Sequence, residues 1–240
     1  MGYLNLDGKD TRIYVQTGMQ TKPDDALKNA QALSQIMREP VGAIVNSTQG
    51  LGKDIEEYLP KAPSLKDALN EYTYQVLNAQ GDKLVVLHSA GNEDAKKALQ
   101  LGQSLGHQYG SLSFVSLGSP LSNSVMRHSV TQPGATYLGQ VNDWRDPVTF
   151  SGLFLTSVGV SGAVGALGTI GAAQAILVGA AAGPAGWMAI GGSATAAGLV
   201  GLGKLAVDAY HPLDNYITKP QAQSILFNWA RKSALPKGLP

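Results

Sequence analysis

The stretch K-L-V-V-L-H-S-A-G, residues 83–91, decides the fold class because it places a short apolar strand directly before a sharp turn. After the lysine, residues 84–87 are continuously apolar, which is typical of a strand buried on both faces of a sheet. The run stops at His88-Ser89-Ala90-Gly91, and a helical pattern resumes over 92–105. The stretch therefore predicts a strand–turn–helix unit.

The chain on both sides of this unit repeats the same alternation of short apolar runs and amphipathic stretches. Further strands are predicted at 12–16, 41–45, 112–117 and 136–141, and further helices at 23–37, 51–58, 64–77 and 221–232. Such alternation indicates the α/β class, with a mostly parallel sheet and helices on both faces. We expect this core in residues 1–146 and its completion in residues 205–240.

Composition excludes several classes of function. The 240 residues contain no cysteine and four histidines, and their formal net charge is +1. A disulfide framework and a thiolate metal site are therefore excluded. A near-neutral chain also lacks the strongly basic character of most nucleic-acid-binding proteins. We expect no metal, no cofactor and no nucleic-acid partner.

An apolar run separates the two parts of the expected core. The 57 residues from 147 to 203 contain no Asp, Glu, Lys, Arg or His and hold 14 of the 29 glycines. A membrane-spanning helix needs about 20 apolar residues, so the run is long enough for two. We interpret residues 147–204 as a Gly/Ala-rich helical insertion, either a lid or a membrane-contacting hairpin. A buried helical pair or a flexible loop in a soluble fold is the alternative.

Ser89 is the candidate nucleophile of the strand–turn–helix unit. A serine hydroxyl needs a base and an exposed, strained position, and the G-x-S-x-G elbow between a strand and a helix provides that position. Ser89 and Gly91 match this pattern, whereas Leu87 stands at its first glycine. The alternative role for Ser89 is a helix cap or a turn residue.

The same unit suggests where a developing oxyanion would bind. The backbone N–H of Ala90 follows the candidate nucleophile and lies at the start of the predicted helix, where N–H groups point outward. We expect the second donor in the turn after the first predicted strand, near Thr17, Gly18 and Met19.

The candidate acid and base follow from chain order, which for an elbow serine is Ser, then Asp or Glu, then His. Asp146 lies after the strand predicted at 136–141, and Pro147 keeps it in a turn. Asp143 is the competing acid, and either aspartate could simply cap a turn. Among the four histidines, His211 alone follows these acids. The alternative is that His211 lies at the surface or at a membrane boundary and is not a base.

Five short blocks follow one another along the chain: Y-V-Q-T-G-M at 14–19, A-I-V-N-S-T-Q-G at 43–50, V-V-L-H-S-A-G at 85–91, N-D-W-R-D-P-V at 142–148 and H-P-L-D-N-Y-I at 211–217. In this order they resemble the blocks of a bacterial lipase-like α/β-hydrolase group. This group occurs at the C-termini of polymorphic toxins and secreted effectors, including type VI lipase effectors. The chain departs from the group at Leu87 and at residues 16–18, where Asn-Gly is common.

The resemblance implies a serine lipase or phospholipase in which Ser89 is the nucleophile, Asp146 the orienting acid and His211 the base. It also implies an antibacterial toxin that is secreted or delivered into a target cell, associates with its membrane and hydrolyses membrane phospholipid. A cognate immunity protein would neutralise it. Two further hypotheses stay open. One is a membrane-inserting or pore-forming toxin with a hydrolase-like scaffold, and the other is a soluble esterase.

Overall fold

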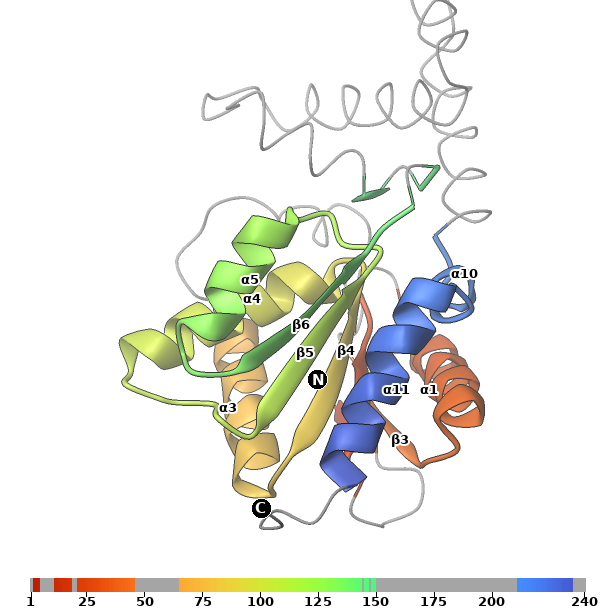
Figure 1. Cartoon of the computed structure of the whole chain (residues 1–240). Helices are drawn as coiled ribbons and strands as arrows, with labels where there is room; N and C mark the ends of the chain where they lie inside the picture. The colour runs from red at the N-terminus through yellow and green to blue at the C-terminus, as the bar shows by residue number, and fades with distance from the viewer. Residues whose placement is uncertain are drawn as a thin grey trace, which may run out of the picture.

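The computed structural model of the chain describes residues 2–4, 11–18, 21–45, 65–143, 145–146, 148–149 and 211–234 (Figure 1). Three predictions lie outside these residues: the apolar insertion beyond Thr149, the helix at 51–58 and the role of Met19.

A six-stranded sheet with the order β1-β3-β2-β4-β5-β6 forms the centre of the fold. Strands β2 to β6 are parallel, whereas β1 pairs antiparallel with β3 at the edge. The strands are β1 Gly2–Leu4, β2 Ile13–Gln16, β3 Val41–Val45, β4 Lys83–His88, β5 Leu112–Leu117 and β6 Thr136–Val141. The five parallel strands confirm the predicted α/β class.

Helices cover both faces of the sheet, as predicted (Figure 1). Helices α1, α10 and α11 pack on one face, and α3, α4 and α5 pack on the other. Their bounds are α1 Pro23–Met37, α3 Leu65–Ala79, α4 Gly91–Ser104, α5 Asn123–Thr131, α10 Asp214–Ile217 and α11 Pro220–Ala234. None of the helices in the described ranges is long and apolar enough to cross a membrane.

Two hydrophobic cores lie on the two faces because side chains of a strand point alternately up and down. In β2, Ile13 and Val15 belong to the core under α1 and α11, whereas Tyr14 belongs to the core under α3 and α4. Strand β4 divides its side chains in the same way. Burial on both faces explains why the sequence of β4 is continuously apolar and does not alternate.

The order of the strands determines where a site can form. The chain moves from β2 to β3 on one side and then crosses to β4 on the other side of β2. In open parallel sheets, ligands bind at the carboxyl ends of the strands, where the order reverses in this way. The carboxyl ends of β2 and β4 are therefore the expected location of a site.

Candidate active site

Ser89 directly follows β4 and has a left-handed backbone, with φ of 56°. This conformation costs a residue with a side chain roughly 1–2 kcal/mol, so other contacts must hold it in place. The Ser89 N–H donates to the Leu117 carbonyl at 3.2 Å, and the Ser89 carbonyl accepts from Asn92 N and Nδ2 at 3.1 and 2.9 Å. The turn predicted from the sequence is thus a strained strand-to-helix elbow.

The loop after β2 packs tightly against this elbow through two glycines. A Cβ added at Gly91 would lie 2.6 Å from the carbonyl oxygen of Gln16, and one at Gly18 would lie 2.4 Å from the backbone nitrogen of Ala90. Neither position has room for a side chain. Both glycines are therefore required by close backbone approach.

Leu87, which departs from the elbow pattern, fits without displacing the helix. Its side chain is fully buried in the core that also contains Tyr74 of α3 and Ala95 of α4. The core between the sheet and helices α3 and α4 therefore accommodates a leucine where the pattern has glycine. The departure is therefore compatible with the elbow.

The structure places Ala90, the first predicted oxyanion donor, beside Gly18 of the loop after β2. No carbonyl or side chain of the described residues accepts a hydrogen bond from the Ala90 N–H. The backbone of Gly18 lies directly against Ala90. A free N–H at the start of α4 is suited to bind an oxyanion, whereas Met19 lies outside the described residues.

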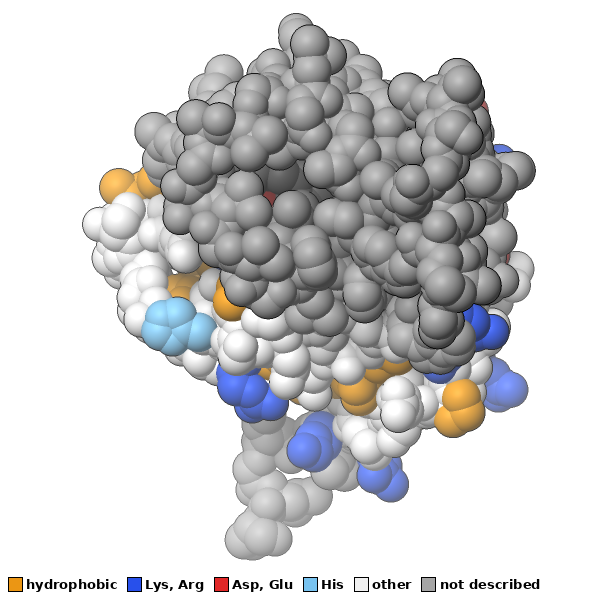
Figure 2. Space-filling model, turned by 90° about the horizontal axis from the view of Figure 1, so that it is seen from above, with side chains coloured by type: hydrophobic (Ala, Val, Ile, Leu, Met, Phe, Trp, Pro, Cys, Tyr) orange, Lys and Arg blue, Asp and Glu red, His pale blue; other side chains and the backbone are white. Residues whose placement is uncertain are grey.

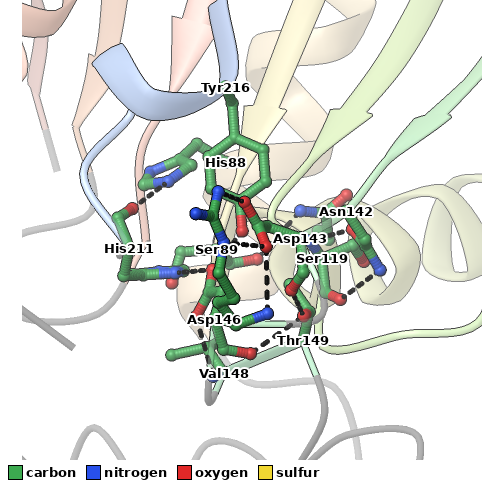
Figure 3. A network of polar contacts seen from close by, with 12 residues as sticks. His88, Ser89, Ser119, Asn142, Asp143, Asp146, Val148, Thr149, His211 and Tyr216 are labelled. Atoms are coloured by element: carbon green, nitrogen blue, oxygen red, sulfur yellow. Dashed lines mark hydrogen bonds and ion pairs between the residues drawn. The ribbon is translucent and has the colours of Figure 1, made fainter. Parts of the chain in front are cut away.

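His211 and Asp146 form a buried hydrogen-bonded pair. The His211 Nδ1 and Asp146 Oδ2 atoms are 2.6 Å apart, and the two side chains are 12% and 0% exposed. Since a carboxylate only accepts, Nδ1 carries the proton of this bond, which makes Nε2 the lone-pair nitrogen of the neutral ring. Nε2 is buried and, among the described residues, has no hydrogen-bond partner, so its bond to Ser89 Oγ is not formed here. Figure 3 shows Ser89 in the same cluster.

Asp143, the competing acid, is occupied by two cations. Arg145 Nη2 and Lys219 Nζ lie 2.8 and 2.7 Å from its Oδ2 atom. The hydrogen bond from Arg145 is the largest cause that holds the pKa of Asp143 well below its usual range, and Lys219 lowers it further. The structure therefore pairs His211 with Asp146, while Asp143 anchors the loop after β6.

Short-range hydrogen bonds fix the turn that carries Asp146. The Thr149 hydroxyl donates to the carbonyls of Asp143 and Asp146 at 2.8 and 3.0 Å, and Val148 N donates to Asp146 Oδ1 at 2.9 Å. Ser119 and Asn142 join the ends of β5 and β6 through bonds of 3.0 and 3.3 Å. The position of the Asp146 carboxylate is therefore set by its own turn and by the sheet (Figure 3).

Two residues of the cluster were not predicted from the sequence. The Tyr216 hydroxyl donates to Asp146 Oδ2, and the ring of His88 stacks on that of His211. Burial, and after it the neighbouring His211, lowers the pKa of His88 well below its usual range. Tyr216 stands five residues after His211 in the block at 211–217, a spacing that could have indicated it.

The face of the molecule seen in Figure 2 and the described His, Asp and Glu side chains can be compared with the cluster around Ser89. Seen from above (Figure 2), the visible described residues present scattered basic and hydrophobic side chains without an extended patch of either kind. Within the described ranges, no three His, Asp or Glu side chains gather where they could hold a metal ion.

Comparisons with protein-family models, curated proteins and solved structures found no match to this chain. The case for a function therefore rests on the geometry of the cluster around Ser89, Asp146 and His211.

Proposed function

We propose that the chain has an α/β-hydrolase fold and is a serine hydrolase in which Ser89 is the nucleophile, His211 the base and Asp146 the orienting acid. The observation that carries the proposal is the 2.6 Å bond between His211 Nδ1 and the buried Asp146, close to a serine with φ of 56°. A carboxylate on Nδ1 fixes the tautomer in which Nε2 accepts a proton. A strained serine between strand and helix is the matching nucleophile.

The proposed reaction proceeds through an acyl-enzyme. Ser89 Oγ attacks the carbonyl carbon of an ester while His211 Nε2 takes its proton, and Asp146 stabilises the resulting imidazolium. The N–H of Ala90, with the loop at Gly18, stabilises the oxyanion. The imidazolium then protonates the leaving alcohol. Water, deprotonated by His211, hydrolyses the acyl-enzyme and restores the serine.

In the proposed mechanism, the hydrogen bond between Ser89 Oγ and His211 Nε2 forms when substrate binds. His88 precedes Ser89 in the chain, and its Nε2 lies 2.9 Å from the carbonyl oxygen of His211, so the base stands beside the elbow. Hydrogen bonds between catalytic groups are often long in free enzymes and tighten in the substrate complex. The free Nε2 of His211 is consistent with such a state.

Acyl esters of membrane phospholipids are the proposed substrates. Support comes from the apolar run at 147–203, which lies between Asp146 and His211 in the sequence. Because these two side chains are hydrogen-bonded, the described residues on either side of the stretch 150–210 meet at the site. A lid or membrane-contacting insertion at 147–204 would then bring lipid to Ser89. The resemblance to lipase effectors extends the proposal to a delivered antibacterial toxin with a cognate immunity protein.

Fatty-acid release from mixed phospholipid vesicles tests the proposal. We expect Ser89→Ala to lower the rate by about a thousandfold or more. Ser129→Ala, which replaces a buried serine on α5, should retain the rate of the unmodified protein. Equal release by Ser89→Ala and the unmodified protein would refute the triad. Vesicle leakage without fatty acid from both would favour a membrane-inserting toxin, and cleavage of soluble esters without vesicle binding would favour a soluble esterase.

A further inference from the structure

Three hydrogen bonds converge on the carboxylate of Asp146. Val148 N donates to Oδ1 at 2.9 Å, while His211 Nδ1, at 2.6 Å, and the Tyr216 hydroxyl both donate to Oδ2. Tyr216 thus shares with His211 the very oxygen that orients the proposed base. Figure 3 shows the phenol ring reaching this carboxylate from α10.

The fold provides a fitted position for the Tyr216 ring. The side chain is fully buried, and the backbone of Gly118, with φ of 56°, lies against the ring edge. A Cβ added at Gly118 would lie 2.9 Å from Cε2 of Tyr216. Because Gly118 has no side chain, the Tyr216 ring occupies the space next to it. This fit fixes the direction of the Tyr216 hydroxyl.

The charged and titratable groups around Tyr216 keep its hydroxyl a donor. They come from each element packed against it: His88 from β4, Asp143 and Asp146 from the loop after β6, and His211 and Lys219 from the chain flanking α10. Burial, followed by the charge of Asp146, raises the pKa of the Tyr216 phenol well above its usual range. The phenol therefore stays protonated at neutral pH and donates its hydrogen bond to the Asp146 carboxylate.

We propose that Tyr216 is a positioning residue for hydrolysis, which acts by sharing Oδ2 of Asp146 with His211; this inference rests on the proposed function. The phenol holds the carboxylate in the orientation that His211 needs. It also draws charge from Oδ2, so the carboxylate stabilises a protonated imidazole less strongly in the free enzyme.

The test is Tyr216→Phe, which removes the hydroxyl and keeps the ring. Loss of a hydrogen bond to a charged group should lower kcat for ester hydrolysis about tenfold, with KM changed less than about twofold because substrate contacts are untouched. The acid limb of the pH–rate profile should move to higher pH, because the freed carboxylate favours the imidazolium.

Tyr109→Phe is the matched control. Tyr109 is also fully buried, and its hydroxyl donates to Glu71 at 2.7 Å, away from the elbow. We expect it to lower the midpoint of thermal unfolding by an amount similar to that of Tyr216→Phe, with an unchanged pH–rate profile. An acid limb that moves equally in both variants, or in neither, would overturn the positioning role.

A second measurement separates this inference from the proposed function. If the unmodified protein shows no Ser89-dependent hydrolysis, the proposed function fails, whereas the coupling can still be read by NMR titration of the His211 ring. A titration midpoint displaced to higher pH in Tyr216→Phe supports the shared oxygen. Coincident titration curves for the two proteins overturn it.

Discussion

The imidazole ring of His88 lies on that of His211, with ring centroids 4.7 Å apart and planes inclined by 25°. The Nε2–H of His88 also donates to the backbone carbonyl of His211 at 2.9 Å. The residue next to Ser89 in the sequence thus supports the ring and the backbone of the proposed base. This double contact links β4 to the chain segment that leads into α10.

The buried His88 predicts a loss of stability in mild acid. Burial, and then His211, lowers its pKa well below the value of about 6.5 expected in the unfolded chain. Below that pH the unfolded state therefore binds more protons, so the free energy of unfolding falls as pH decreases. Urea unfolding at pH 7.5 and pH 5.5 measures this slope.

His88→Phe retains a ring on His211 and removes the titrating group, so the pH slope should become shallower. His128→Gln, at an exposed position on α5, should leave the slope unchanged. Identical slopes in the unmodified protein and His88→Phe would show that His88 is not the group responsible.

Replacing Asp146 and Asp143 one at a time distinguishes the residue that orients His211 from the residue that anchors the loop after β6. Asp146→Asn removes the acceptor for His211 Nδ1–H and should lower kcat by about 10³-fold to 10⁴-fold. Asp143→Asn weakens the ion pairs with Arg145 and Lys219, which lie outside the proposed triad. It should keep kcat within about threefold. Steady-state kinetics on a soluble ester compare the two, and a larger loss in Asp143→Asn would reverse the assignment.

Gly18→Ala should obstruct the proposed oxyanion hole. Its methyl group would lie 2.4 Å from the Ala90 nitrogen, so either the loop after β2 or the elbow must shift. Loss of one oxyanion donor costs about a hundredfold in kcat, and we expect a decrease of that order. Gly110→Ala adds the same methyl group where no atom lies within 4 Å, and it should be neutral. Comparable activity of both variants would contradict the oxyanion role of this loop.

Continuous apolar runs made most of the fold predictable. Strands β3, β5 and β6 and helix α1 have the predicted bounds, because local pattern and tertiary burial agree there. Three elements were not predicted. Strand β1 is three residues long in a polar segment and α10 is a single turn, so both depend on tertiary contacts. Helix α5 has a Ser122 cap and few apolar residues to form a pattern.

Only the part of the site that follows from a sequence motif with a known local geometry was predictable. An elbow serine, an acid in a turn after a strand and a later histidine are readable from order, and the structure brings Asp146 and His211 into contact. Their catalytic roles stay predictions. The contacts of Tyr216 with Asp146 and of His88 with His211 join residues 70 and 123 positions apart. Neither pairing follows from local pattern, because each joins segments that only the tertiary fold brings together.

The hydrogen bond between Asp146 and His211 has a consequence for the modularity of this chain. It joins a residue at the entrance of the stretch 150–210 to the residue directly after its end. The folded core thus holds the two flanks of residues 150–210 together, and the entropic cost of connecting two such points rises only slowly with the length of the connection. A different segment could therefore replace residues 150–210 during evolution without any change to the sheet that positions Asp146 and His211.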